Sequence, residues 1–170
     1  MWGFTGQRRP DFAEAPGPGQ ESVWDYPRPP RVVSDARAVL VKHGDRVVAE
    51  SRASIRVCET ASPPTFYLPA DDVHLDLLQP MGVRSFCEWK GAAMHWALKE
   101  DPSRTIVGWS YPEATDAFAS IKGYMAFFPS KLQCFVAGER VRPQPGSFYG
   151  GWITSDVVGP FKGEPGTSHW

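Results

Sequence analysis

The stretch RAVLVKHGDRVVAESRASIRVC, residues 37–58, decides the fold class of this 170-residue chain. Residues 38–41 are rich in β-forming side chains, KHGD supplies a turn containing Gly44, and residues 46–50 return as a second β-rich run. Residues 54–59, SIRVCE, then alternate apolar and polar side chains, which is typical of a half-buried strand. The stretch therefore predicts a β-hairpin followed by a third strand.

The rest of the chain repeats this pattern of short β-rich segments separated by turn residues. Further strands are predicted at residues 65–69, 83–89, 92–98, 104–111, 124–128 and 131–141, the last of these as a hairpin. Helical structure is expected as one turn in residues 70–78 and as a short helix in residues 113–121, because Glu113 and Asp116 suit the first turn of a helix. The sequence predicts a mainly β fold: one small domain of short antiparallel strands with one or two short helices.

Three segments differ in composition. Residues 1–30 are rich in Pro, Gly and charge, so we expect an extended N-terminal arm that packs through Trp24 and Tyr26. Residues 31–142 hold the predicted strands and form the core domain. Residues 143–170 are rich in Gly and Pro but carry five aromatic side chains, which flexible linkers rarely do. We therefore expect both termini to wrap around the core, with the aromatic tail docked on the core or on a partner.

Composition and charge exclude several classes of partner. The chain has 18 basic and 19 acidic residues without a basic stripe, so nucleic acid is not an expected partner. No stretch approaches the ~20 apolar residues of a membrane span, and the first residues lack the apolar run of a signal peptide. We expect a cytoplasmic monomer or homodimer without membrane contact and without a cofactor.

The spacing of the cysteines is not that of a disulfide-bonded or zinc-binding protein. Cys58, Cys87 and Cys134 are an odd, well-separated set with no CxxC pair, which argues against disulfides and against a zinc site. We expect free thiols and no metal.

The segment CEWKG, residues 87–91, is the first candidate site. A lysine ammonium beside a thiol favours the nucleophilic thiolate, so Cys87 and Lys90 can form a catalytic pair. On a regular strand the two side chains face opposite sides, but Gly91 predicts a bend that brings Lys90 towards Cys87 and towards Glu59 at the end of an earlier strand. The alternative is that Cys87 is a core thiol and Lys90 a solvated cation.

Two acidic positions follow strand ends. Glu59 is a candidate base or ligand-binding residue, because no helix follows that it could cap. Asp72 can act as a base or bind a ligand, but capping of the following helical turn by Asp71 or Asp72 is the favoured interpretation. His95, between Met94 and Trp96, is interpreted as structural.

Aromatic side chains are the remaining candidates for a binding site. No phosphate-binding glycine loop, HExxH or GxSxG motif occurs. Tyr67, Trp109 and Tyr111 lie near Pro-broken strand ends, where they can pack in the core or line a cup for a flat or cationic ligand.

These residues belong to a wider pattern across residues 32–142. The pattern comprises Glu59, Tyr67, Pro69, Asp72, Cys87, Lys90, Gly91, Trp109, Tyr111, Pro112, Gly123 and Phe127. With it, the chain resembles the family catalogued as domain of unknown function 427, and residues 148–170 resemble the tail of many bacterial members. The resemblance implies a bacterial protein with a β-tent fold, shared with methionine sulfoxide reductase B and the ligand-binding domain of cereblon. Those relatives usually hold zinc on two CxxC pairs, which this chain lacks, so zinc is not carried over.

Three functions remain open at this point. The first is a small-molecule-binding module, with Tyr67, Trp109 and Tyr111 as an aromatic cup and with Glu59 and Lys90 fixing polar groups. The second is an enzyme in which Lys90 activates Cys87 and a nearby carboxylate, Glu59 or Asp72, acts as the base. The third is an interaction protein that assembles through its aromatic tail.

Overall fold

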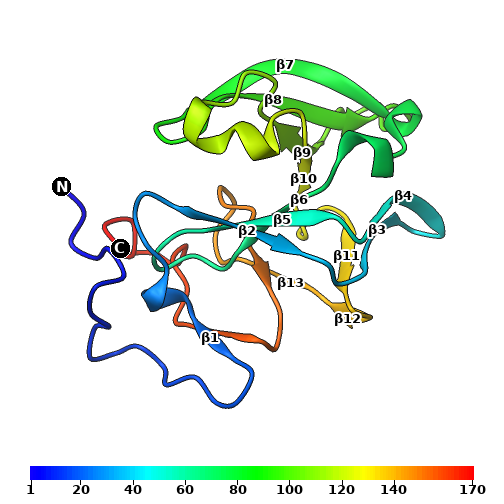
Figure 1. The fold of residues 1–170 in the computed structure, drawn as a ribbon. Helices are drawn as coiled ribbons and strands as arrows, with labels where there is room; N and C mark the ends of the chain where they lie inside the picture. The colour runs from blue at the N-terminus through cyan, green and yellow to red at the C-terminus, as the bar shows by residue number, and fades with distance from the viewer.

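The predicted hairpin is the centre of a four-stranded sheet. In the computed structural model, which describes residues 1–170, β3 (Val39–His43) and β4 (Arg46–Ser51) pair antiparallel and turn at Gly44, whose φ is +61°. Strand β11 (Gln133–Val136) pairs with the other edge of β3 and is followed by β12 (Glu139–Arg140), giving the order β12-β11-β3-β4 (Figure 1). Both predicted hairpins are therefore present, and they join into one sheet.

A three-stranded sheet, β2-β5-β6, lies beside this one. It contains β2 (Arg31–Asp35), β5 (Ser54–Cys58) and β6 (Thr65–Tyr67), all antiparallel. Every residue of β5 is buried, so the predicted half-buried alternation is wrong. The reason is that β5 is covered on both sides, and the buried Arg56 is accommodated by ion pairs to Glu21 at 2.7 Å and Asp35 at 3.3 Å.

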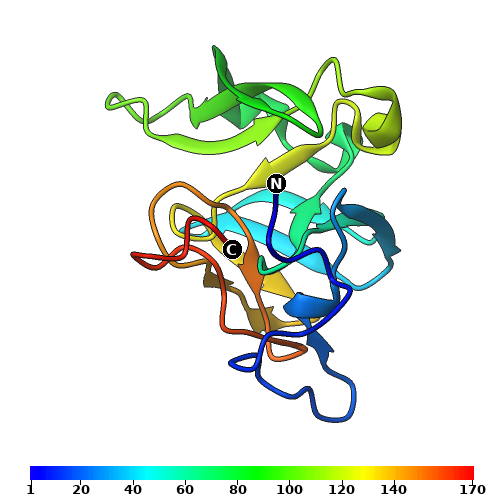
Figure 2. The same ribbon diagram turned by 90° about the vertical axis from the view of Figure 1, so that its left-hand side faces the viewer.

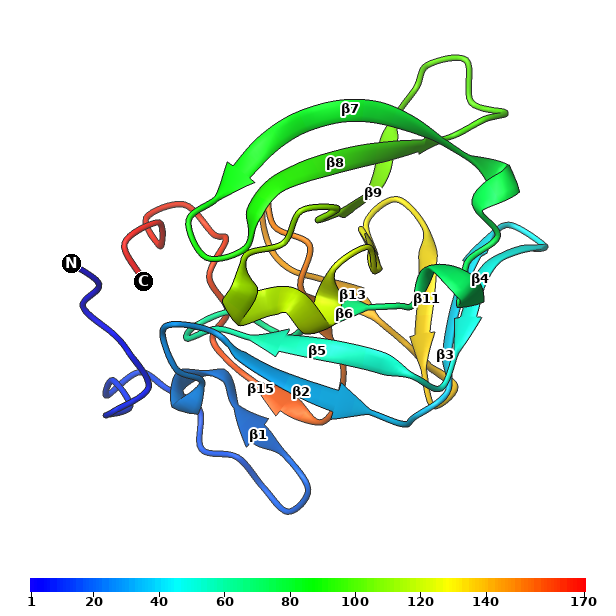
Figure 3. The same ribbon diagram turned by 45° about the horizontal axis from the view of Figure 1, so that its top comes forward.

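The third large sheet arches over the other two. Its order is β10-β9-β8-β7, with β7 (Leu78–Cys87) and β8 (Gly91–Leu98) forming a long hairpin. Strands β9 (Ile106–Ser110) and β10 (Met125–Phe127) connect it to the middle of the molecule (Figure 1). Figure 3 shows the β7–β8 hairpin arching over the other strands. Strand β7 begins five residues earlier than predicted, because residues 78–80 pair with residues 96–98 of β8 before an irregularity between Pro80 and Val83.

Helical structure consists of short 3₁₀ elements. The segment predicted as one helical turn forms two, η2 (Ala70–Asp72) and η3 (Leu75–Leu77). The predicted helix begins later than expected, as the 3₁₀ element η4 (Asp116–Ile121), in which Phe118 has a non-helical φ of −118°. Its two buried side chains are spaced i, i+3, which matches three residues per turn. None of these helices is long and apolar enough to cross a membrane.

Both ends of the chain run along the core and meet. Strand β1 (Glu21–Ser22) pairs parallel with β15 (Val157–Val158), and η1 (Val23–Asp25) follows β1 directly. Trp24 and Tyr26 of this N-terminal segment are buried. The two termini lie close together in both side views, on one side of the molecule (Figures 1 and 2).

Trp152 is a buried anchor of the tail in the core. A short pair of strands, β13 (Arg142–Pro143) and β14 (Trp152–Ile153), begins it. The Trp152 ring is fully buried, stacks on Phe66 at 4.9 Å between ring centroids, and donates from its indole nitrogen to the Phe127 carbonyl at 2.9 Å. Phe148, in contrast, is 76% exposed, so not every aromatic side chain of the tail is buried.

The architecture confirms the predicted mainly β fold of small antiparallel sheets with little helix. The assignment to the β-tent fold stays a prediction from the resemblance, as does the division into arm, core domain and tail.

A pair of tail substitutions tests the docking of the tail. Replacement of Trp152 by Ala removes a fully buried ring and is expected to lower the free energy of unfolding by about 3–5 kcal/mol. The matched change Phe148→Ala removes an exposed ring and should stay within ~0.5 kcal/mol of the wild type. Denaturant unfolding measures both values. Equal effects of the two substitutions would show that the tail is not held as described.

The bend at Gly91 is testable in the same way. Gly91 has a φ of +105°, and a Cβ there would lie 3.3 Å from the Glu113 carbonyl oxygen. We expect Gly91→Ala to destabilise the protein by about 1 kcal/mol or more, because both the backbone conformation and the contact oppose a side chain. Gly3→Ala is the control, since a Cβ at Gly3 meets nothing within 4 Å. Thermal unfolding of the two variants compares them, and an unchanged Gly91→Ala protein would contradict the bend.

Candidate functional site

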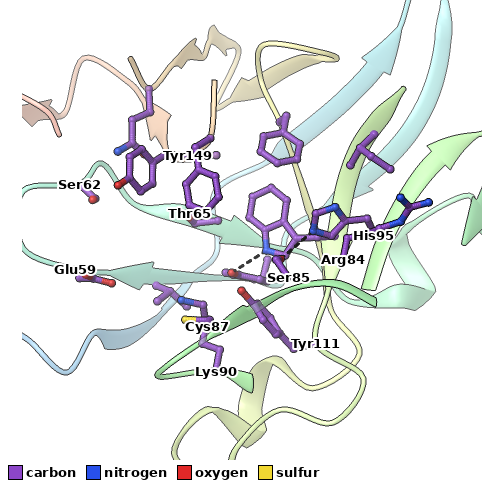
Figure 4. Close-up of a pocket in the computed structure, with 18 of the residues that line it drawn as sticks. Glu59, Ser62, Thr65, Arg84, Ser85, Cys87, Lys90, His95, Tyr111 and Tyr149 are labelled. Atoms are coloured by element: carbon purple, nitrogen blue, oxygen red, sulfur yellow. Dashed lines mark hydrogen bonds between the residues drawn. The ribbon is translucent and has the colours of Figure 1, made fainter. Parts of the chain in front are cut away.

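A cavity of about 860 Å³ lies under the β7–β8 hairpin. Its walls come from β5 and β6, the end of β7 and the following turn, β9, and the tail loop at residues 147–150. Figure 4 shows that Glu59, Cys87, Lys90 and Tyr111 surround it on one side, while Tyr149 of the tail lies on the other. The cavity is thus built by parts of the chain that are far apart in sequence.

The predicted aromatic cup is one wall of this cavity. The rings of Tyr67, Trp109 and Tyr111 are buried and line it, with centroids 6.2 Å apart for Tyr67 and Trp109 and 6.3 Å for Tyr67 and Tyr111. The Trp109 indole nitrogen donates to the Tyr67 hydroxyl at 3.3 Å, which fixes both rings. Burial raises the pKa of both tyrosines, so their hydroxyls stay protonated at neutral pH.

The tail completes the wall behind Trp109. A Cβ on Gly150 would lie 2.2 Å from the Trp109 ring, so only glycine lets the backbone lie flat on the indole at this point. Phe128 packs on Trp109 from another direction, at 4.6 Å between ring centroids. The cup is therefore held rigid by the core and by the tail together.

Lys90 reaches the cup, but it does not reach Glu59 in the predicted way. Its ammonium lies 5.7 Å from the centre of the Tyr111 ring and 5.8 Å from that of Phe118, and it is partly buried. The Glu59 carboxylate pairs instead with Arg28 at 3.1 Å. Lys90 and Glu59 line the same cavity but form no ion pair, because the N-terminal arm supplies Arg28 as the partner of Glu59, which the strand pattern could not indicate.

Cys87 is the one cysteine on the cavity. It is partly buried and lines the wall, whereas Cys58 and Cys134 are buried in the core. Burial raises the pKa of Cys58 to about 11 and that of Cys134 to about 12, so both are inert thiols. The prediction of three free thiols matches the structure, in which no pair is bonded.

Asp72 lies away from the cavity. It is in η2 next to β4 and accepts a hydrogen bond from the Ser51 hydroxyl at 2.6 Å. Neither Asp71 nor Asp72 caps η2, whose N-cap residue is Pro69, so the capping interpretation is wrong as well. The structure thus brings together Glu59, Tyr67, Cys87, Lys90, Trp109 and Tyr111, and leaves out Asp72.

Sequence reasoning missed a polar pair in the cavity. The Ser85 hydroxyl lies 3.1 Å from the His95 Nε2 atom, and both side chains line the wall (Figure 4). Burial lowers the pKa of His95, and the Arg84 guanidinium lowers it further, so the imidazole is neutral at neutral pH. Ser85 is two residues from Cys87 on a predicted strand, so the sequence could have placed both side chains on the same face. For His95 no such signal existed.

The side chains that commonly bind metal ions are not clustered in this structure. No three His, Cys, Asp or Glu side chains gather closely enough to hold a metal ion. The chemistry available in the cavity is therefore that of rigid aromatic faces, neutral hydroxyl groups, one thiol and several charged side chains.

The sequence matches a known family over most of its core. Residues 31–138 match the family described as domain of unknown function (DUF427), and the chain belongs to that family. No curated protein gives a significant match.

Thiol labelling tests the placement of the three cysteines. Native protein treated with iodoacetamide should gain one adduct, on Cys87, because Cys58 and Cys134 are buried with raised pKa values. Peptide mass spectrometry locates the adduct, and unfolded protein, which should label at all three sites, is the control. Labelling of Cys58 or Cys134 as fast as Cys87 in the native protein would contradict this placement.

Proposed function

We propose that the protein binds a small organic molecule in this cavity. A planar part of the ligand lies against Tyr67, Trp109 and Tyr111, and Lys90 and Glu59 contact its polar groups. The observation that carries the proposal is that six side chains from separate elements converge on one cavity. Its volume of about 860 Å³ is in the range of sites for drug-sized ligands, which are ~300–1,000 Å³.

The rigidity of the cup supports binding. Ordering side chains on binding costs free energy, and a preformed wall avoids much of this cost. The Trp109–Tyr67 hydrogen bond and the contact of Gly150 with the indole fix the rings through contacts within the protein. Burial of a flat apolar ligand face against them contributes roughly 25 cal/mol per Å² of apolar area removed from water.

A fragment screen tests the proposal. Compounds with aromatic or heteroaromatic rings are screened by thermal shift, and binders are then mapped by their effect on the Trp109 indole resonance, assigned with Trp109→Phe. We expect binders that raise the melting temperature and shift this resonance, since a ligand that binds only the folded state stabilises it. Lys90→Met should leave the fold intact and weaken the binders that carry a polar group.

The matched control is Lys122→Met. Lys122 has the same side chain, 58% exposed, and lies outside the cavity lining. This change should affect no binder. A screen without any compound that shifts the Trp109 resonance would contradict the proposal, and so would binders that lose the same affinity in both lysine variants.

The enzyme alternative rests on one specific observation, the position of Cys87 on the cavity wall. It is the weaker candidate, because Glu59 is paired with Arg28 and Asp72 lies elsewhere, so neither carboxylate is placed as a base. If Lys90 activates Cys87, iodoacetamide labelling should stay fast at pH 6 and should slow in Lys90→Met. Labelling that follows the pH dependence of a free thiol would leave binding as the function.

The tail-mediated interaction hypothesis gains less support. Trp152, the most buried tail aromatic, packs within the chain itself, and the tail loop completes the cavity. The tail thus has a use that requires no partner.

A further inference from the structure

We infer that the cavity selects planar organic anions, such as aromatic carboxylates, with Lys90 binding the negative charge. This inference rests on the proposed function and adds the chemical class of the ligand. The observation behind it is that cations of the protein lie against aromatic rings that line the cavity.

An aromatic cup by itself suggests a cationic ligand, since the face of an aromatic ring attracts positive charge. In this protein the ammonium group of Lys90 already lies beside the Tyr111 ring of the cup. The Lys90 ammonium lies within 6 Å of the centres of the Tyr111 and Phe118 rings, at 5.7 and 5.8 Å. A second cation at the cup would be repelled by Lys90, and an anion would be attracted to it.

The rings on the opposite side of the cavity are occupied in the same way. The Arg28 guanidinium lies 4.0 Å from the centre of the Trp2 ring. The Lys162 ammonium lies 4.7 Å from the centre of the Trp2 ring and 5.5 Å from that of Tyr149. On both sides of the cavity, therefore, a cation of the protein already lies over an aromatic ring, Tyr111 on one side and Trp2 and Tyr149 on the other.

The remaining charges make the cavity positive. Lys90, Arg84 and Lys131 line it and form no ion pair with any carboxylate. Two carboxylates line it, and Glu59 is already paired with Arg28, while Glu88 is exposed to solvent. An anionic ligand would find cations without partners, and a cationic ligand would not find a free buried carboxylate.

Among these three cations Lys90 is the best placed. Lys162 also lines the cavity, but it is buried and already donates to the Trp170 main-chain oxygen at 3.2 Å. Arg84 and Lys131 are exposed, so solvent screens their charges, whereas Lys90 is partly buried against the rings. A carboxylate attached to a flat ring in the cup would meet the ammonium in a setting of lower dielectric, where the attraction is stronger than in water.

Three matched probes test the inference: indole-3-acetate, indole-3-acetamide and tryptamine, which share one ring and differ in charge. Ligands of this size bind with dissociation constants on the order of 1 mM, so titration by NMR on the Trp109 indole resonance is suitable. We expect the acetate to bind at least about fivefold more tightly than the acetamide, as charge-assisted hydrogen bonds are about twice as strong as neutral ones. Tryptamine should bind weakest, and added salt should weaken the acetate alone.

Variants separate this inference from the proposed function. Lys90→Met should weaken the acetate more than the acetamide and so abolish the preference for the acetate, whereas Lys122→Met should change neither. Equal binding of acetate and acetamide to the wild type would overturn the anion assignment and leave the proposed function standing. Tightest binding of tryptamine would also overturn it. Failure of all three probes would contradict the anion assignment, and the fragment screen would still decide the proposed function separately.

Discussion

One buried guanidinium, that of Arg28, ties together three parts of the chain. Its side chain is 1% exposed, and it donates to the Phe4 carbonyl at 2.8 Å, the Thr60 carbonyl at 3.1 Å and the Trp170 main-chain oxygen at 2.8 Å, besides its ion pair with Glu59. A buried charge is tolerated only when its hydrogen bonds are satisfied and an opposite charge is near. The requirement to satisfy this one group holds the N-terminal arm and the tail against the end of β5.

The consequences of this arrangement reach the cavity. Because Arg28 is paired with Glu59, this carboxylate, one of the two that line the cavity, is not free to serve as a base or as a partner for Lys90. Lys90 is left against the aromatic rings, and the tail is kept where Gly150 contacts Trp109. The charge and the shape of the cavity thus both depend on segments outside the strands that form most of its walls.

Features that depend on neighbouring residues could be predicted from the sequence, whereas contacts between residues far apart in the chain could not. The hairpin of β3 and β4 was predictable because a local turn at Gly44 joins two β-rich runs, and the cup was predictable because three aromatic residues lie near strand ends. The Arg28–Glu59 pair joins residues 31 positions apart, and the arm that carries Arg28 has only a two-residue strand, β1, so no periodicity in the sequence indicates the pair. Asp72 was misplaced because its partner is the Ser51 hydroxyl, a contact across two elements that no local pattern encodes.

The burial of β5 illustrates the same point in the core. Alternation along a strand predicts one solvent-facing side, but one face of β5 packs towards the cup through Ile55 and Val57, and the arm covers the other. Arg56 is consequently buried, and two acidic residues on different segments offset its desolvation. The alternation of side chains thus predicted the strand itself but not its burial, because the second face of β5 is covered by residues 1–30.

The position of Lys90 also explains how an anion could bind at low cost. A free lysine side chain loses about 1.5–2 kcal/mol of conformational entropy when it is fixed, and a ligand normally bears that loss on binding. In this protein the turn before Gly91 and the contacts with Tyr111 and Phe118 already restrict the side chain. The rings attract the ammonium but provide no counter-charge, so its hydrogen-bonding capacity stays available. An aromatic cup that holds the protein's own cation is therefore a prepared site for a ligand of the opposite charge.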